Sequence, residues 1–203
     1  MTRIVAGTVG GRTLVVPPSG TRPTSERVRE ALFSRLEHDG VIDGGRVLDL
    51  FAGSGALGIE AASRGAAAVT LVESARKAAD IARRNVATLG LEGTVRVLAE
   101  PAERYVARLA ADGTPGGEAL DLVLVDPPYD LPATALADLL ANLAEPGVLA
   151  ADAVVVVERA RRSGAPDWPD GLDPVTTKTY GDTAVHYAEP SDHDGPDGPD
   201  GQF

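Results

Sequence analysis

The 203-residue chain contains no cysteine, one methionine and three histidines. Without cysteine, disulfide bonds, thiolate metal sites and a cysteine nucleophile are excluded. His38, His186 and His193 are widely separated, so we expect no metal site. Long apolar runs are also missing: the longest, Ala153–Val157, has the length of a strand, and the first residues lack a secretory pattern. These absences favour a globular cytoplasmic protein that does not span a membrane.

Positive charge is scarce in most of the chain. The 19 basic and 30 acidic residues give a formal net charge of −11, which by itself argues against a nonspecific polyanion binder. The distribution is uneven, because residues 1–35 hold six arginines against two glutamates, a local charge of +4. Residues 191–203 instead hold four aspartates among glycines and prolines, which is typical of a disordered acidic tail.

The central part of the chain alternates strand-like apolar segments with amphipathic helical ones. Alternation over roughly 110 residues predicts βαβ units and a doubly wound α/β domain with a mostly parallel sheet. The expected strands are Arg46–Phe51, Ala68–Glu73, Thr94–Leu98, Leu120–Val125 and Ala153–Glu158, and the expected helices are one through Glu60 to Arg64, about Ala75–Leu89, Ala102–Ala111 and one that starts near Pro132.

Smaller elements are expected at both ends. Two strand-like segments around Gly181-Asp182 predict a C-terminal antiparallel hairpin at the sheet edge, with Lys178 and His186 exposed. A glycine-rich turn predicts a small N-terminal hairpin, and Thr24 or Ser25 then caps a helix. The hairpin segments are Arg3–Ala6, Arg12–Val16, Val175–Tyr180 and Thr183–Ala188. We therefore expect an extension over residues 1–38, a main domain over 39–190 and a tail over 191–203.

The first motif is Asp49-Leu50-Phe51-Ala52-Gly53-Ser54-Gly55-Ala56-Leu57-Gly58. Its glycines spell G-x-G-x-x-G between a strand and a helix, where a backbone can closely approach a nucleotide-like cofactor. Asp49 would repel a pyrophosphate but attract an ammonium and a sulfonium, which favours S-adenosylmethionine over NAD. Glu73 ends the next strand, where its carboxylate could accept both ribose hydroxyls of either cofactor. A tight turn without a ligand is the alternative interpretation.

The second motif, Asp126-Pro127-Pro128-Tyr129, directly follows an expected strand, a place where doubly wound folds hold their sites. The Asp126 carboxylate and the Pro127 carbonyl could hold the hydrogens of a planar exocyclic amine and take up its proton during methyl transfer. Tyr129 offers a flat face for stacking a base. The loop is therefore typical of amino-group methylation, although an ordinary proline-rich turn is the simpler interpretation.

Two further segments carry a resemblance: Arg22-Pro23-Thr24-Ser25-Glu26-Arg27-Val28-Arg29-Glu30-Ala31-Leu32-Phe33 and Tyr180-Gly181-Asp182-Thr183. With the first two motifs they resemble the RsmD-like family of 16S ribosomal RNA guanine-N2 methyltransferases, which are class I S-adenosylmethionine-dependent enzymes. The resemblance covers about residues 3–188. It implies a seven-stranded Rossmann-like sheet, S-adenosylmethionine as cofactor, and methylation of the guanine 966 type. The expected partner is 16S ribosomal RNA in an assembling small subunit, and the expected state is a monomer.

The resemblance also assigns roles to residues. Asp126, Pro127, Pro128 and Tyr129 would form the catalytic loop. Glu100 would meet the adenine amine of the cofactor. The RNA contacts would be Arg22, Thr24, Arg27 and Arg29, although arginines on an amphipathic helix are equally explained as its solvated face. The full set of expected cofactor residues is Asp49, Phe51, Gly53, Ser54, Gly55, Gly58, Glu73 and Glu100.

Three alternatives stay open at this point. The same proline loop could serve adenine N6 in DNA or RNA, or a protein amide nitrogen, although the chain shows no evident separate target-recognition domain. An NAD-dependent oxidoreductase would also use the glycine motif and Glu73, but Asp49 opposes a pyrophosphate. A noncatalytic RNA-binding module would not need the proline loop.

Overall fold

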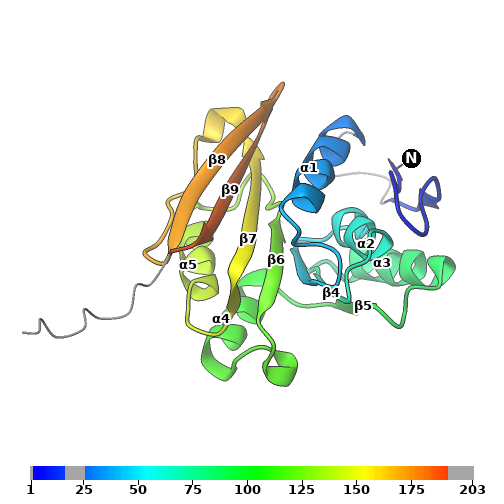
Figure 1. Cartoon of the computed structure of the whole chain (residues 1–203), viewed down its shortest axis with the longest axis horizontal. Helices are drawn as coiled ribbons and strands as arrows, with labels where there is room; N and C mark the ends of the chain where they lie inside the picture. The colour runs from blue at the N-terminus through cyan, green and yellow to red at the C-terminus, as the bar shows by residue number, and fades with distance from the viewer. Residues whose placement is uncertain (1, 17–25, 192–203) are drawn as a thin grey trace, which may run out of the picture.

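A seven-stranded sheet with the order β5-β4-β3-β6-β7-β9-β8 forms the centre of the computed structural model, which describes residues 2–16 and 26–191 (Figure 1). Strands β3 to β7 run parallel, whereas β9 pairs antiparallel with β7 and β8 pairs antiparallel with β9. This confirms the predicted fold class. The strands are β3 (Arg46–Leu50), β4 (Ala68–Val72), β5 (Val95–Leu98), β6 (Leu120–Val125), β7 (Leu149–Ala160), β8 (Leu172–Tyr180) and β9 (Thr183–Pro190).

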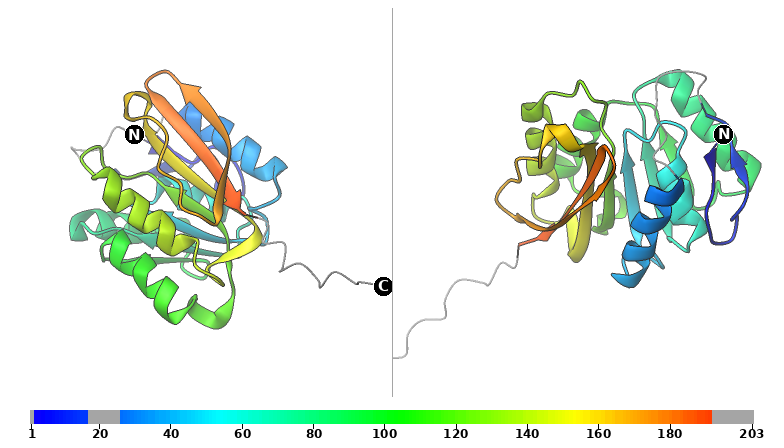
Figure 2. Two further views of the ribbon diagram at one scale, coloured as in Figure 1. Left: turned by 90° about the vertical axis from the view of Figure 1, so that its left-hand side faces the viewer. Right: turned by 90° about the horizontal axis from the view of Figure 1, so that it is seen from above.

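Helices cover both faces of this sheet, which gives three layers (Figure 2). Successive residues of a strand point to opposite faces, so Val47 packs in the cluster of α1, α2 and α3, while Leu48 packs with α4 and α5. Within the described residues no helix is long and apolar enough to cross a membrane. The helices are α1 (Glu26–His38), α2 (Ala56–Ser63), α3 (Arg76–Leu89), α4 (Ala102–Asp112) and α5 (Ala133–Leu143), with one-turn helices η1 (Pro115–Gly117) and η2 (Arg161–Ser163).

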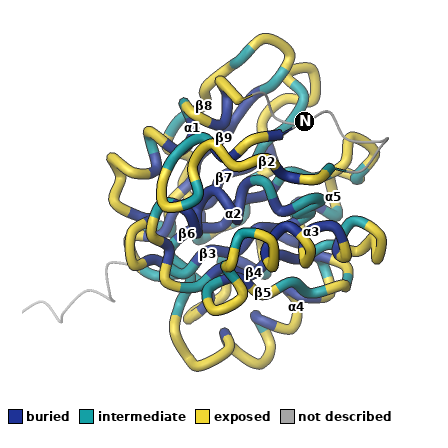
Figure 3. The backbone as a smooth tube through the Cα atoms, turned by 90° about the vertical axis from the view of Figure 1, so that its right-hand side faces the viewer, coloured by how far each residue is buried: buried dark blue, intermediate teal, exposed yellow. Residues whose placement is uncertain are grey.

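The N-terminal extension shares the core of the main domain. Strands β1 (Thr2–Arg3) and β2 (Thr13–Leu14) form the predicted antiparallel hairpin. Ile4 and Leu14 are buried in the same hydrophobic cluster as α1, α2 and α3. Figure 3, coloured by burial, shows both buried and exposed stretches in the N-terminal hairpin. The predicted cap residues Thr24 and Ser25 and the predicted tail from residue 192 onward lie outside the described residues.

The C-terminal hairpin is longer than its sequence pattern, and one of its residues was placed wrongly. β8 begins at Leu172 and takes Pro174 into a register irregularity, which an edge strand tolerates. His186 was expected to be exposed but is 5% exposed, because β9 is an interior strand between β7 and β8. Its Nδ1 lies 2.9 Å from the Thr177 hydroxyl oxygen.

Candidate active site

The glycine motif forms a tight loop between β3 and α2. Phe51 adopts a φ of 61°, an uncommon left-handed conformation for a non-glycine residue and a form of strain that clusters at functional sites. Gly55 (φ 84°) precedes the first turn of α2. A Cβ atom at Gly58 would lie 2.2 Å from Leu71 Cδ2 on β4. Glycine at position 58 therefore lets α2 lie directly on the sheet beneath the loop.

Asp49 lies under this loop. Its side chain is 1% exposed, and its Oδ2 accepts a hydrogen bond from the Gly58 N–H at 2.8 Å. The pKa of Asp49 is raised to about 7, chiefly by burial; the Gly58 hydrogen bond opposes this shift and the nearby Glu73 adds to it. The carboxyl group therefore anchors the first turns of α2 as well as adding negative charge beneath the loop.

Glu73 follows β4 and lies beside the glycine loop. Its Oε2 accepts a hydrogen bond from the Gly53 N–H at 2.8 Å, and its Oε1 accepts one from the Ala75 N–H at 2.7 Å. Each carboxylate oxygen can accept more than one hydrogen bond, so this geometry leaves capacity for ribose hydroxyls. The backbone contacts fix the carboxylate in one orientation.

Glu100, the residue expected to meet adenine, is held by an arginine. Its two oxygens accept hydrogen bonds from Arg108 on α4 at 2.9 and 2.8 Å. These bonds keep the pKa of Glu100 below its usual value. The sequence pattern gave no sign of this pair, which spans eight residues, and the contact to adenine stays a prediction.

Asp126 follows β6 at the same sheet edge. Leu50 of β3 pairs with Val125 of β6, so Phe51 and Asp126 leave the sheet side by side. Asp126 is partly exposed as a residue, yet burial of its carboxyl group raises its pKa well above the usual value, and Glu158 and Asp49 raise it further. A carboxylate with a raised pKa is the better proton acceptor.

Glu158 is an acid that lies outside both sequence motifs. It lies on β7, one residue beyond the pairing of Val125 with Val157, which brings it beside Asp126. The sequence does contain a sign of this residue, because an acid ends the expected strand Ala153–Glu158. Four carboxyl groups, those of Asp49, Glu73, Asp126 and Glu158, therefore gather at one edge and favour a positively charged ligand.

Asn85, also outside both motifs, joins the N-terminal extension to the glycine loop. From α3 its side-chain NH₂ donates to the carbonyl oxygens of Val15 and Ser54, both at 2.9 Å. Its Oδ1 accepts from the Val15 N–H at 2.9 Å. Asn85 is 3% exposed. In the sequence, its place as a polar residue on the apolar face of α3 indicates a buried hydrogen-bonding role.

The predicted RNA residues divide into three cases. Arg27 on α1 is exposed, while Arg22 and Thr24 lie outside the described residues. The prediction for Arg29 needs correction, because its side chain is 1% exposed and its Nε lies 3.6 Å from Glu60 Oε2. Helical spacing already indicated this, since position 29 lies three and four residues before Leu32 and Phe33 on the buried stripe of the helix.

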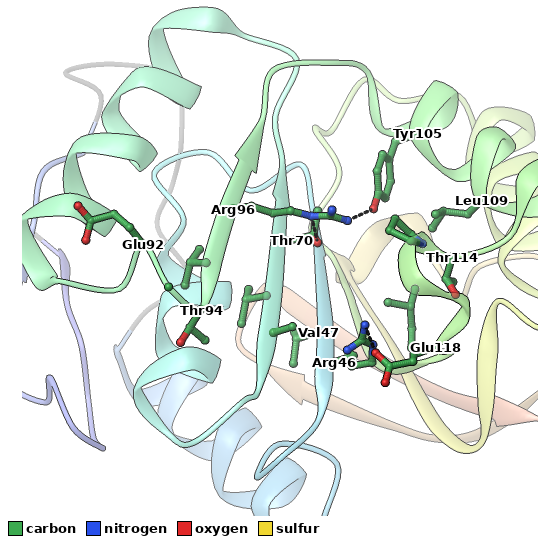
Figure 4. A pocket seen from close by; sticks show the side chains of 16 residues that line it. Arg46, Val47, Thr70, Glu92, Thr94, Arg96, Tyr105, Leu109, Thr114 and Glu118 are labelled. Carbon is green, nitrogen blue, oxygen red and sulfur yellow. Dashed lines mark hydrogen bonds and ion pairs between the residues drawn. The ribbon is translucent and has the colours of Figure 1, made fainter.

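A hollow of about 260 Å³ lies at the opposite end of the parallel strands (Figure 4). Arg46 at the start of β3 pairs there with Glu118. Arg96 donates hydrogen bonds to the Thr70 and Tyr105 hydroxyl groups at 2.8 and 3.0 Å. Doubly wound folds bind ligands at the carboxyl ends of their strands, so the edge with the four carboxyl groups is the candidate active site.

Comparison with known proteins gives consistent relatives. A family model described as conserved hypothetical protein 95 matches residues 2–189. The putative rRNA methyltransferase YlbH of Bacillus subtilis is 36% identical over 184 residues, which cover 90% of this chain and 96% of that protein. Ribosomal RNA small subunit methyltransferase D of Escherichia coli is 56% identical over 75 residues, and this match spans only 37% of that protein.

A solved structure, that of the putative methyltransferase YhhF from Escherichia coli, has the same fold. It is 36% identical, with a TM-score of 0.78, and the match covers 93% of this chain and 97% of the other. The Rossmann-like methyltransferase fold implies S-adenosylmethionine as the cofactor, and the carboxyl groups around the glycine loop fit its cationic centres. The chain therefore belongs to the RsmD-like methyltransferase family described as conserved hypothetical protein 95.

Proposed function

We propose that this protein transfers a methyl group from S-adenosylmethionine to the exocyclic N2 amine of a guanine in 16S ribosomal RNA, of the position-966 type. The proposed substrate is RNA in an assembling small subunit, and the protein acts as a cytoplasmic monomer. The observation that carries the proposal is Asp126, a carboxyl group with a strongly raised pKa beside the glycine loop. The likeness to rRNA methyltransferases supports RNA as the substrate class.

The cofactor would lie over the glycine loop. Glu73, already oriented by the Gly53 and Ala75 N–H groups, would accept the ribose hydroxyls. The Asp49 charge beneath the loop favours the cofactor's ammonium and sulfonium. When bound, S-adenosylmethionine supplies a methyl group on a sulfonium, which is released as a neutral thioether when the methyl group leaves.

Asp126 and Pro127 would act on the amine. An aromatic amine is a poor nucleophile because its lone pair is delocalised into the ring. The Asp126 carboxylate and the Pro127 carbonyl would each accept an amine hydrogen and aim the nitrogen at the methyl group. As the N–C bond forms, nitrogen becomes positive, and Asp126 takes the proton that it loses. Tyr129, 70% exposed, would stack against the base after it leaves its helix or loop.

Asp126→Asn tests this proposal. We expect methyl transfer to fall by about 10²- to 10⁴-fold, because the amide cannot accept the proton. Binding of S-adenosylmethionine, measured by calorimetry, should change little. The assay uses labelled cofactor with 16S ribosomal RNA, free and in subunits, from cells that lack the enzyme, followed by mass analysis of the nucleosides. In the unmodified protein the rate should rise with pH until the Asp126 carboxyl group is ionised.

Asp130→Asn is the matched control, since Asp130 is an exposed acid that follows the same loop. It should keep the activity. N6-methyladenine or a methylated protein amide as the product would contradict the guanine assignment. A loss of cofactor binding in Asp126→Asn would contradict the role given to Asp126, and unmodified RNA in every form would contradict the activity.

A further inference from the structure

Tyr129 forms one wall of a cavity on the outer side of the proline loop. The cavity has a volume of about 480 Å³ and is lined by Tyr129, η2 and the tip of the β8–β9 hairpin. Its size falls within the range of small-ligand sites, roughly 300 to 1,000 Å³. We call it the rim cavity; its lining residues are Tyr129, Ala160, Arg161, Arg162, Asp182 and Thr183.

The walls of the rim cavity are held in place by the backbone. The Arg161 N–H donates a hydrogen bond to the Asp182 carbonyl oxygen at 2.8 Å. Ala160 at the end of β7 pairs with Thr183 at the start of β9. The one-turn helix after β7 and the hairpin tip accordingly lie next to each other in Figure 1. The cavity therefore exists before any ligand binds.

The charge of the rim cavity is opposite to that of the active-site edge. Arg161 and Arg162 are exposed, and neither forms a salt bridge within the part of the chain that the structure describes. Asp182 is the one acid in the lining, so the lining carries two positive charges against one negative. Glu158, beside Asp126, lies only three residues before Arg161. The rim cavity, with its excess of positive charge, therefore adjoins the edge that carries the four carboxyl groups.

These features fit a strand that carries both phosphates and flat bases. Guanidinium groups form paired hydrogen bonds with phosphate oxygens, and the exposed Tyr129 ring can stack on any base. We propose that the rim cavity binds the nucleotide next to the target guanine, with Arg161 and Arg162 on its phosphodiester group. This inference rests on the proposed function, since it names how that site holds its RNA.

The test compares Arg161→Ala/Arg162→Ala with the unmodified protein. Filter binding of transcribed 16S ribosomal RNA is measured between about 0.05 and 0.2 M salt, in the presence of S-adenosylhomocysteine. Plotted against log salt, log K falls with a negative slope. Loss of two phosphate contacts should make this slope shallower by about 1.4 and weaken binding on the order of tenfold. In the methylation assay, KM for RNA should rise by a similar factor while kcat and cofactor affinity stay within about twofold.

Two variants keep the result specific. Arg83→Ala/Arg84→Ala removes the same charge from two exposed arginines on α3, which packs beside β5 at the other edge of the sheet, and should keep the slope and KM. Arg161→Lys/Arg162→Lys keeps the charge and should restore most of the slope. If the salt dependence of the double lysine variant matches that of the double alanine variant, positive charge at these positions does not bind the phosphates, and the inference is overturned.

The inference and the proposed function can fail separately. If the unmodified protein methylates guanine N2 but the double alanine variant keeps its slope and KM, the inference is overturned and the function stands. If the unmodified protein transfers no methyl group to RNA, the function is overturned. The salt slope then still decides whether the rim cavity binds phosphates, because filter binding requires no catalysis.

Discussion

Asp49 is a buried acid whose pKa lies close to neutral pH, so it ties the stability of the fold to pH. The folded carboxyl group titrates at about 7, whereas the unfolded chain has the ordinary value of 3.8. Between these two values the folded state binds more protons than the unfolded state. The free energy of unfolding therefore falls as pH rises through this interval. Above about pH 7 the folded protein bears the full cost of burying the ionised Asp49 carboxylate.

Asp49→Asn should remove that cost. The amide oxygen can still accept the hydrogen bond from the Gly58 N–H, but no charge has to be buried. We expect the variant to be more stable than the unmodified protein by up to about 4 kcal/mol at pH 8, and equally stable at pH 4. Urea unfolding without cofactor, over a series of pH values, measures this difference. Asp130→Asn is the control, and a gain in stability that does not change with pH would refute the explanation.

The positions of single residues were predictable where the backbone decides them. The order of strand, glycine loop and helix gave Asp49, Glu73 and Asp126 their places at one sheet edge. Long-range side-chain pairs were not predictable in the same way. Arg108 holds Glu100 through a contact across a strand–helix junction. Arg29 was misjudged because its charge was given more weight than its place on the apolar stripe of α1.

At the scale of elements, α2 joins the active site to the N-terminal extension. Its first turns lie under the glycine loop, and nearly all of its residues are buried. Glu60, in its middle, accepts hydrogen bonds from the N–H groups of Val5 and Ala6 at 2.7 and 3.0 Å. The same carboxylate accepts one from Arg64 Nε at 2.8 Å and lies opposite Arg29 of α1. In the sequence, a glutamate between the apolar residues Ile59 and Ala61 already indicates a buried charge with a partner.

Glu60→Gln should loosen the extension. The neutral side chain leaves the Arg29 guanidinium buried without its counter-charge, and its NH₂ group faces backbone N–H donors. We expect a loss of about 3 to 5 kcal/mol in the free energy of unfolding, together with faster proteolytic cleavage within residues 2–16. Urea unfolding and timed proteolysis provide the two measurements.

Glu37→Gln is the matched control for this prediction. Glu37 pairs with the same Arg64 at 2.9 Å, but its side chain is 48% exposed. Arg64 is 5% exposed, but in this variant it keeps its bond to Glu60 and loses only a half-exposed partner, so we expect a loss of less than about 1 kcal/mol. Equal losses in the two variants would show that Arg64, rather than the buried carboxylate of Glu60, holds the extension.

At the scale of the whole molecule, the sequence pattern predicted the sheet because each parallel strand is a short apolar run between helical segments. The alternation did not give the order of the strands, which the structure supplies. The pattern could not show how α1 and the N-terminal hairpin pack, because their few apolar residues join the main core through contacts distant in sequence. It also could not show the rim cavity, whose walls come from three separate segments.

Net charge is a property of the whole molecule that opposes the proposed substrate. A charge of −11 repels RNA at long range, whereas Arg161 and Arg162 act only at contact. Four of the acids, Asp192, Asp194, Asp197 and Asp200, lie in the C-terminal segment outside the described residues. Changing these four to asparagine keeps the chain length and reduces the net charge from −11 to −7.

We expect this fourfold asparagine variant to bind 16S ribosomal RNA about two- to fivefold more tightly at low salt, because long-range repulsion is reduced. The gain should vanish near 1 M salt, where the Debye length is about 3 Å rather than about 10 Å at 0.1 M. Filter binding across this range measures it, and the double alanine variant of the rim cavity should change affinity in the opposite direction. Equal affinities at low salt would mean that these four acids do not contribute to the repulsion of RNA. The affinity for RNA would then depend on the local charge at the rim cavity and not on the net charge of the whole protein.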